Sequence, residues 1–370
     1  MTIVVWVRAP IPCGDFICPY TMGQLVHDPA RIYNVDTFRA AQVSFVPASA
    51  SLFYPPVYPP QLAVAMAPFS RLPFGVAVTI WSVIMIGCYA LIVRSAYRTV
   101  NLHLDPALFS LLAIGFPPFV EMLQYGQNTV LLLGACFLGW KALERKRSFF
   151  AGAAFGLLAL KPQFGVPLAV LVLAGREWRM LAGAVASIAA QAAIVWVVMG
   201  SGAFSGFYAF VPQIIANANA LEHVAQRVHS IRSITRLLPH PLETPVWIAA
   251  IAAILVAVAI VWRSQVPVRV RLGFAMLAGV LTSPHLIVYD ATLLALPLVW
   301  LGAWANTQAN AKEYALAVGL LFIALALPWS SLTRIQPSVV VMLWIAHQVW
   351  RSVRRIPDVP TGVLEQSRGM

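Results

Sequence analysis

Charged residues are scarce in this chain. Only 10% of its 370 residues are charged and 13 are acidic, whereas 60% are hydrophobic. A typical globular domain is about one-quarter charged. A soluble fold of this length cannot hide so much apolar surface, so the composition excludes a soluble protein and indicates a membrane protein. The formal net charge of +12 comes with no lysine-rich arm and no basic helix with interleaved aromatics, so nucleic acid is not an expected partner.

Cysteine is also rare, with four in the chain. Their positions fit neither a disulfide framework nor a zinc site. Cys88 and Cys136 lie in apolar runs and are expected to be packing residues. Cys13 and Cys18 lie in an expected external loop; a local disulfide is one alternative, but so short a loop strains the bond, and two free thiols are the preferred interpretation. Because no dense carboxylate cluster suggests magnesium, we expect neither a metal nor a cofactor.

What the chain does contain is a series of apolar runs. A spanning helix needs about 20 mostly apolar residues, and the first clear run covers 74–93. The later runs cover 106–124, 128–143, 149–160, 162–174, 180–199, 246–262, 270–283, 286–301, 314–328 and 337–350. They predict an all-α polytopic membrane protein with roughly 10–11 apolar helical segments. We expect a single integral membrane domain over residues 1–350.

The basic residues lie in clusters between these runs. The larger clusters are found at 141–147, 176–179, 263–271 and 351–355. If the chain changes side at each run, all of them fall on one side, which the positive-inside rule makes cytoplasmic. Residues 351–370 are then a basic cytoplasmic tail. The first external segment covers residues 1–72 and the second external loop covers 200–245.

Several runs are too short to cross the bilayer as straight helices. The clearest pair is 149–160 and 162–174, which meet at Lys161–Pro162 and whose outer ends both face the predicted cytoplasm. Short or broken helices at membrane depth are tolerated where they are buried in protein or line a polar cavity. We therefore expect a broken hairpin at Lys161 and a cavity in the external half of the molecule.

The external segments carry their own signals. Asp28 is a suitable helix N-cap with Pro29 in the first turn, and the prolines of 53–60 require extended backbone. Residues 207–238 alternate apolar and polar side chains at helical spacing, which predicts juxtamembrane helices on the membrane surface. Residues 1–12 contain too few apolar positions to cross a bilayer, so we expect the chain to lack a complete first transmembrane helix.

Charged groups within apolar segments are functional candidates, because burying them in a membrane is costly. Lys161 and Asp290 fit this rule best, and Glu121 is next. Each has a structural alternative: Lys161 would pair with Asp290 or cap carbonyls, and Asp290 would orient a neighbour rather than react. Asp15 has the weakest structural alternative, because it is no obvious cap, lies beside the membrane boundary and is followed by Phe16 rather than by a solvated charged run.

The remaining candidates are polar or basic side chains near the predicted external ends of helices. His285 lies at a helix end and could be an ordinary polar cap. Asn128 follows Gln127 at the start of a helix, where an Asn is a routine N-cap. Arg232 and Arg236 lie on a surface helix, where an arginine is usually solvated or bound to lipid headgroups.

Five segments resemble, in order, the landmarks of glycosyltransferase family 87. They are "CGDFICPYTMGQL…DPARIYNVDTFRAAQ", "YPPVYPPQLAVAMAPFSRLPFGVAVTIW", "GQNTVLLLGACFLGWKALERKR", "AGAAFGLLALKPQFGVPLAVLVLAGREWR" and "LTSPHLIVYDATLL". Any one motif is weak, but five in order over residues 13–300 are fairly specific. This family belongs to the C-type glycosyltransferase superfold of multi-pass membrane enzymes. The best-known members of the family are mycobacterial mannosyltransferases and arabinan biosynthesis enzymes.

The resemblance implies a role for individual residues. Asp15 matches the catalytic aspartate, His285 the histidine of the "SPH" stretch, and Lys161 and Arg236 the basic residues expected at the donor phosphate, with Arg232 beside them. The expected supporting residues are Gln127, Asn128, Gln163, Tyr289 and Asp290. One departure is Pro19, since relatives continue from the aspartate into a helix of aromatic and small residues.

The resemblance further implies a polyprenyl-phosphate sugar donor and an active site on the external face of the bacterial plasma membrane. We expect an inverting transfer of a hexose (mannose-like) or a pentose to a lipid or glycan acceptor, with Asp15 as general base. Two alternatives stay open. A secondary transporter or lipid flippase shares broken helices and embedded charge, but should hold its substrate near the midplane of two repeats. A non-catalytic scaffold or decayed enzyme is suggested by the short N-terminal segment.

Overall fold

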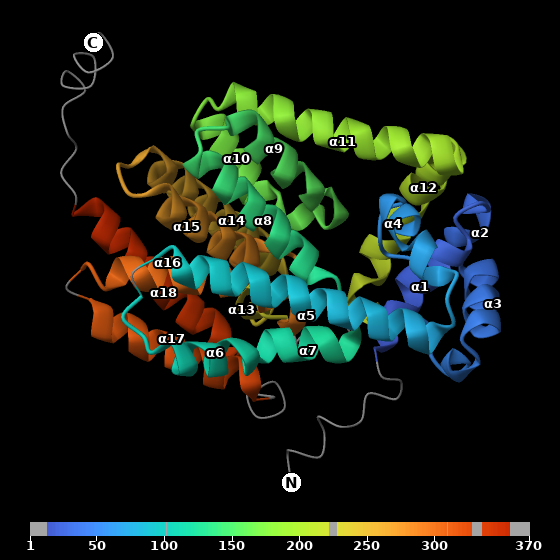
Figure 1. The fold of residues 1–370 in the computed structure, drawn as a ribbon, viewed down its shortest axis with the longest axis horizontal. Coiled ribbons are helices and arrows are strands. Elements are labelled where there is room, and N and C mark those ends of the chain that lie inside the picture. Colours follow the sequence, from blue (N-terminus) through green and yellow to red (C-terminus); the bar gives the residue numbers. More distant parts are fainter. Residues whose placement is uncertain (1–12, 101, 222–227, 309, 328–334, 356–370) are drawn as a thin grey trace.

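The computed structural model describes residues 13–100, 102–221, 228–308, 310–327 and 335–355, with the side chains of 217–221 left out (Figure 1). These parts are helical and contain no strand, which confirms the all-α prediction. Five helical stretches in them are long and apolar enough to cross a membrane: Phe74–Arg98, Pro106–Tyr125, Trp178–Met199, His240–Arg263 and Val288–Ala305. The chain is a multi-pass membrane protein. The predicted incomplete first helix, within residues 1–12, and most of the basic tail lie outside the described residues.

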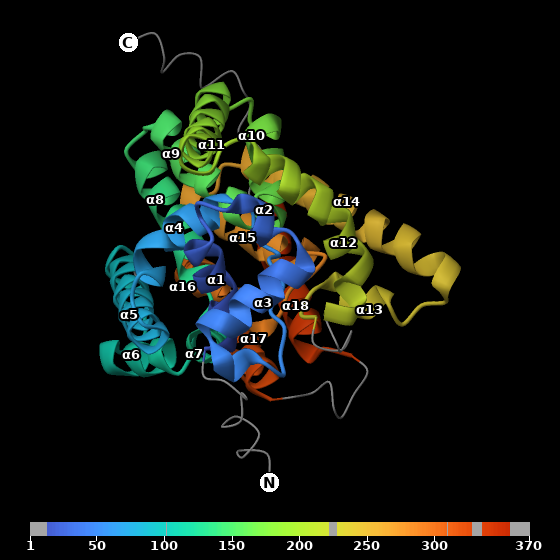
Figure 2. The ribbon, with the colours of Figure 1, turned by 90° about the vertical axis from the view of Figure 1, so that its right-hand side faces the viewer.

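Long helices form the outside of the bundle. In Figure 1, α5 (Phe74–Arg98) and α11 (Trp178–Met199) extend along much of the molecule. Figure 2 shows α14 (His240–Arg263) projecting from one side. Few residues of α11 and α14 are buried inside the protein, although both helices consist mainly of Ala, Val and Ile. Such surfaces are stable against lipid rather than water.

Two apolar runs that were predicted as single helices are divided. The run 106–124 forms α6 (Pro106–Ile114) and α7 (Pro117–Tyr125). Phe116 between them has extended backbone, because the proline that follows disfavours the helical conformation. The run 286–301 begins as a 3-10 helix, η7 (Val288–Leu294), and continues as α16 (Ala295–Ala305). The broken start of this segment is the part that carries Asp290.

The predicted broken hairpin is present. The first arm consists of α9 (Ser148–Gly156) and η4 (Leu157–Leu160), and the second of η5 (Pro162–Phe164) and α10 (Val166–Ala174). Lys161 lies between them with φ −140° and ψ 80°, outside the helical region. The hairpin packs against a central layer in which Trp140 and Trp300 are fully buried, with ring centroids 5.0 Å apart. That layer and its neighbours comprise α8 (Thr129–Glu144), α15 (Val268–Thr282), α17 (Ala311–Ala326) and α18 (Pro337–Arg354).

The predicted first external segment, from residue 13 onward, is a compact group of short helices at one end of α5 and α11 (Figure 1). They are η2 (Gly14–Phe16), α1 (Ile17–Gln24), α2 (Pro29–Ile32), α3 (Val35–Phe45), η3 (Pro47–Ser49) and α4 (Gln61–Ser70). Pro19 is the third residue of α1, where a backbone N–H has no intrahelical partner, so the proline is tolerated. Asp28 occupies the predicted N-cap position of α2 but makes no capping hydrogen bond. Residues 52–57 form no regular structure. The extended backbone predicted for 53–60 does not reach the end of that range, because Pro60 has helical backbone and directly precedes α4.

Residues 200–245, predicted to form the second external loop, contain α12 (Gly202–Leu221) and α13 (Ile231–Thr235). Glu222, His223 and Arg227, which the sequence places in the same loop, lie outside the described residues. The ring of Tyr33 contacts Phe207, with centroids 5.5 Å apart. The two predicted external segments therefore touch each other.

Candidate active site

The short helix η2, which carries Asp15, is held against the turn between α7 and α8. The backbone N–H of Cys13 donates to the carbonyl oxygen of Gln124 at 2.8 Å. Gly126 in this turn has φ +70°, a conformation that glycine adopts without strain. A Cβ atom at Gly126 would lie 2.8 Å from Cβ of Phe16 and 2.9 Å from Cβ of Cys13. Glycine is therefore needed both for the turn and for the close approach of Asp15.

Gln127, the next residue, joins three groups through one buried amide. Its Nε2 donates to Oδ2 of Asp15 at 2.7 Å. Its Oε1 accepts from the hydroxyl of Tyr58 at 2.9 Å and from Nζ of Lys161 at 3.3 Å. Both of the groups facing Oε1 are donors and the carboxylate facing Nε2 is an acceptor, so these partners assign the amide orientation.

Lys161 and Asp290 form a buried ion pair. Nζ of Lys161 lies 2.7 Å from Oδ1 of Asp290, and both side chains are less than a tenth exposed. The hydroxyl of Thr129 donates to the same carboxylate oxygen at 2.7 Å. Nζ of Lys161 also lies 5.8 Å from the ring centroid of Tyr58 and 5.6 Å from that of Tyr289. The pairing considered as a structural alternative for Lys161 is present, and it also connects Lys161 to Gln127.

Asp15 is only partly exposed, and its environment shifts its acidity. Burial raises the pKa of its carboxyl above the ordinary value, because desolvation disfavours the charged form. The hydrogen bond from Gln127 and the positive charges of Lys161 and His285 act in the opposite direction, while the charge of Asp290 raises the pKa further. A carboxylate with a raised pKa and some remaining exposure is suited to accept a proton near neutral pH.

The loop that carries His285 is connected to the segment before α13. The hydroxyl of Ser283 donates to the carbonyl oxygen of His285 at 2.6 Å. The backbone N–H of His229 donates to the carbonyl oxygen of Leu286 at 2.8 Å, and its Nδ1 lies 2.7 Å from the hydroxyl of Ser338. Thus the segment before α13 lies beside the "SPH" loop and is also connected to α18.

The two predicted phosphate-binding arginines on this segment lie against α14. The guanidinium of Arg232 lies 4.8 Å from the ring centroid of Trp247. Nε of Arg232 and Nε1 of Trp247 are both buried without a hydrogen-bond partner among the described residues. Nε of Arg236 is 4.0 Å from Oε1 of Glu243. Arg232 and Arg236 therefore both contact α14, whereas Lys161 belongs to the Asp15 network.

Asn128 and Gln163, two of the expected supporting residues, lie near the Asp15 network. Asn128 is at the N-cap position of α8 and is only 4% exposed, but its side chain makes no capping bond, and its Oδ1 has no partner in the described part of the chain. Gln163 is half-buried in η5, two residues after Lys161. Glu121 is half-buried on α7.

Sequence reasoning missed Tyr58 and Thr129. Tyr58 lies in the proline-rich stretch that was predicted only to be extended, and Thr129 immediately follows Gln127 and Asn128 in the sequence. Both are polar groups that complete hydrogen bonds to buried partners. Cys13 and Cys18 are free thiols, as preferred from the sequence. Within the described ranges, no three His, Cys, Asp or Glu side chains come together as a metal site would require.

Curated proteins of related sequence act on sugars. The chain is 26% identical over 308 residues to a polyprenol-phosphate-mannose-dependent α-(1-2)-phosphatidylinositol pentamannoside mannosyltransferase of Mycolicibacterium smegmatis, covering 80% of this chain and 72% of the relative. The protein of the same description from Mycobacterium tuberculosis is 26% identical over 310 residues, covering 80% and 68%. An α-(1→3)-arabinofuranosyltransferase of M. tuberculosis is 30% identical over 136 residues, covering 35% and 31%.

No solved structure is significantly similar to the chain. A family model does match it: residues 57–288 fit the model described as glycosyltransferase family 87. The match covers more than half of the chain and includes the segments that carry Tyr58, Gln127, Lys161 and His285. The resemblance seen in the sequence motifs is thereby confirmed: the chain belongs to glycosyltransferase family 87.

Proposed function

We propose that the protein transfers a mannose-like hexose or a pentose from a polyprenyl-phosphate donor to a lipid or glycan acceptor. The relatives, which include polyprenol-phosphate-mannose-dependent mannosyltransferases and an arabinofuranosyltransferase, support this substrate class. The reaction takes place at the external face of the bacterial plasma membrane, with the C-terminus in the cytoplasm. The side on which the basic clusters gather supports that orientation.

In this mechanism Asp15 is the general base. It removes the proton from the acceptor hydroxyl, whose oxygen attacks the anomeric carbon of the sugar. The bond between that carbon and the phosphate oxygen breaks, and its electron pair leaves with the polyprenyl phosphate. A single displacement of this kind inverts the anomeric centre and needs no second carboxylate as nucleophile. The observation that carries the assignment is the hydrogen bond from Gln127 to Oδ2 of Asp15, which leaves Oδ1 for the substrate proton.

Gln127, Tyr58 and Lys161 are positioning residues in this proposal. Because Tyr58 and Lys161 both donate to Oε1, the amide of Gln127 cannot turn over without losing two hydrogen bonds. Its N–H group therefore always faces Asp15. The chain of contacts from Asp290 through Lys161 and Gln127 holds the base in one orientation before the substrates arrive.

The donor phosphate is assigned to basic groups on the same side of the molecule. Arg232 has a buried Nε without a described partner and lies beside the similarly unpartnered indole N–H of Trp247, so two donors are present for an anion. Arg236 on the same segment adds positive charge. Lys161 has three N–H groups, of which Asp290 and Gln127 use two. His285, whose charge acts on Asp15, is placed at the junction of phosphate and acceptor.

The test is transfer by the purified full chain in lipid nanodiscs, with radiolabelled polyprenyl-phosphate mannose and a lipid acceptor extract. Asp15→Asn should abolish product formation while expression and membrane insertion stay unchanged. Asp36→Asn is a matched control, because Asp36 is an exposed acid in the same external segment. Transfer by the Asp15→Asn protein at the wild-type rate would show that the base is another group. Uptake of intact donor by proteoliposomes without any transfer would favour the transporter alternative.

A further inference from the structure

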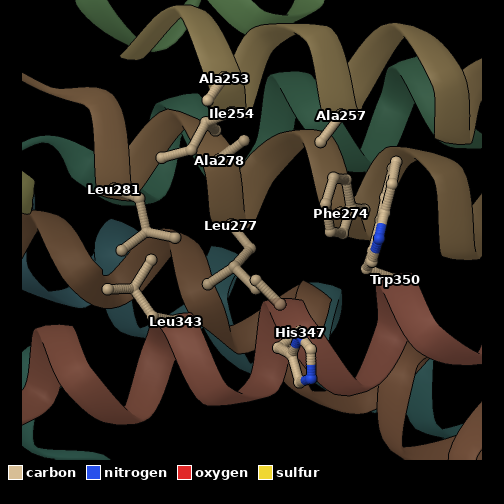
Figure 3. A pocket seen from close by; sticks show the side chains of 11 residues that line it. Ala253, Ile254, Ala257, Phe274, Leu277, Ala278, Leu281, Leu343, His347 and Trp350 are labelled. Carbon is tan, nitrogen blue, oxygen red and sulfur yellow. The ribbon is translucent and has the colours of Figure 1, made fainter. Parts of the chain in front are cut away.

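A cavity of about 230 Å³ lies between α14, α15 and α18, away from the Asp15 network (Figure 3). It is lined by Ala253, Ile254, Ala257, Phe274, Leu277, Ala278, Leu281, Leu343, Ala346, His347 and Trp350. Apart from the imidazole and the indole N–H, the lining is apolar. Few residues of α14 are buried in the protein, so one wall of this groove belongs to a helix that faces lipid.

One end of the groove is flanked by positive charge. The guanidinium of Arg354 lies 5.6 Å from the ring centroid of Trp350, which lines the groove. Arg271 lies one helical turn before Phe274, another lining residue, and so on the same face of α15. Figure 3 shows Phe274 and Trp350 side by side at one end of the groove. Arg271 and Arg354 therefore lie on the helical turns next to that end of the groove.

Arg271 has donor capacity that the described residues do not use. Its Nη1 donates to the carbonyl oxygen of Trp262 at 3.0 Å, and its guanidinium lies 4.8 Å from the ring centroid of Trp262. Its Nε is buried without a hydrogen-bond partner in the described parts of the chain. Glu177 is the acidic group whose charge acts on Arg271. Arg354 and His347 are exposed, and His347 also lines the groove.

We propose that this groove binds one anionic phospholipid, with an acyl chain along α14, α15 and α18 and the phosphate between Arg271 and Arg354. The acyl chain fills an apolar space that water would occupy poorly, and the phosphate accepts charge-assisted hydrogen bonds from the two guanidinium groups. His347 donates to the ester or phosphate oxygens. The basic termini of α14, α15 and α18 all lie at the Phe274–Trp350 end of the groove. Lys and Arg side chains at such a place attract the anionic headgroups of the cytoplasmic leaflet.

This lipid is not the sugar donor. The contacts of Arg232 and Arg236 are made near the start of α14, at Trp247 and Glu243. The charged end of the groove lies beyond Ala257, near the other end of the same helix. A phosphate bound there is separated from Asp15 by much of the length of α14, so the site supports the fold or its membrane position rather than sugar transfer.

The experiment is native mass spectrometry of the full chain, titrated in a neutral detergent with phosphatidylglycerol or with phosphatidylcholine of the same acyl chains. Phosphatidylglycerol should bind one site at least about tenfold more tightly, because two charge-assisted hydrogen bonds depend on its accessible negative charge. The variant Arg271→Gln/Arg354→Gln should lose this preference. Arg94→Gln/Arg98→Gln removes the same charge at the basic end of α5 and should retain it.

A second variant tests the acyl chain independently of the headgroup. Ala278→Leu places a larger side chain in the groove and should weaken both lipids several-fold, while lipid-free thermal unfolding shows that the chain is folded. Glycerol 3-phosphate, which has the headgroup charge without the tails, should not compete. Equal binding of the two lipids, an unchanged preference in the arginine variant, unchanged binding in Ala278→Leu, or competition by glycerol 3-phosphate would each overturn the proposal.

Discussion

Gln127 donates to Oδ2 of Asp15 at 2.7 Å across 112 positions of the chain. This one amide joins the N-terminal group of short helices to the broken hairpin, because its carbonyl oxygen is bound by Lys161. The proposed base is thus positioned by a residue of another segment rather than by its own helix. Its properties should respond to changes in that network.

Replacing Asp15 by Asn should not destabilise the protein at neutral pH. Burial raises the pKa of Asp15 in the folded state, so the unfolded chain ionises first and the folded state loses stability as the pH rises through this range. Asn cannot ionise and can still accept the hydrogen bond from Gln127. The unfolding temperature in detergent should therefore be equal or higher for the variant at neutral pH, and the difference should shrink in mild acid. The prediction would be contradicted if the stability of the Asp15→Asn variant, measured relative to wild type, were lower at neutral pH than in mild acid.

Replacing Gln127 by Leu should move the acidic limb of the pH–rate profile to higher pH. The hydrogen bond from Gln127 lowers the pKa of Asp15, so its loss leaves the base protonated over a wider range. The rate should fall most in mild acid and recover in part as the pH rises. Gln191→Leu is the control, since Gln191 bonds to the carbonyl oxygen of Gly156 on another helix pair. A uniform loss of rate at every pH would indicate a structural role only.

Removing one partner of the Lys161–Asp290 pair should be strongly destabilising. Both side chains are buried, and a buried charge without its partner costs about 3–5 kcal/mol. Lys161→Met should lower the unfolding free energy by that order, and Lys161→Met/Asp290→Leu should recover most of it without restoring transfer. Denaturant titration in mixed micelles measures the unfolding free energy of the wild type and of each variant. If the single and double variants are equally unstable, the ion pair is not the source of the effect.

Arg232→Gln should weaken use of the donor. A charge-assisted hydrogen bond is worth about 1.5–3 kcal/mol, so the KM for polyprenyl-phosphate sugar should rise about tenfold or more, with a smaller change in the acceptor KM. Steady-state kinetics with both substrates varied measures the donor KM and the acceptor KM separately. Arg31→Gln is the control on the first external segment, where Arg31 is exposed and lies 3.9 Å from Asp28. A rise confined to the acceptor KM would move Arg232 to the acceptor side.

His229 should make the protein sensitive to acid. Burial lowers the pKa of this side chain to about 4, against about 6.5 in the unfolded chain. Below pH 6.5 the unfolded state takes up a proton that the folded state does not, so stability is lost as the pH falls from about 6.5 towards 4. The unfolding temperature of His229→Gln should change less over this range. Parallel pH curves for the two proteins would contradict the prediction.

Much of the helical architecture could be predicted from the order of apolar runs and basic clusters along the sequence. The apolar runs and the basic clusters indicated a polytopic helical protein, and Lys161–Pro162 located the broken hairpin correctly. The two prolines after Phe116 also indicate a break in the helix of run 106–124. That break was not predicted, because the run is long enough for a single spanning helix. The partners of Gln127 could not be predicted in the same way. A hydrogen bond from Tyr58 depends on how a proline-rich segment crosses the bundle, and no local pattern records that path.

The buried pair of Lys161 and Asp290 also has a consequence for biosynthesis. The two residues are 129 positions apart, so the hairpin bearing Lys161 leaves the ribosome long before its counter-ion does. During that interval the ammonium group must stay at the aqueous boundary or in a hydrated channel, because a lone charge at membrane depth is costly. The hairpin can settle at its final depth only after the segment carrying Asp290 has entered the bilayer, which makes late insertion of that segment the step that completes the candidate site.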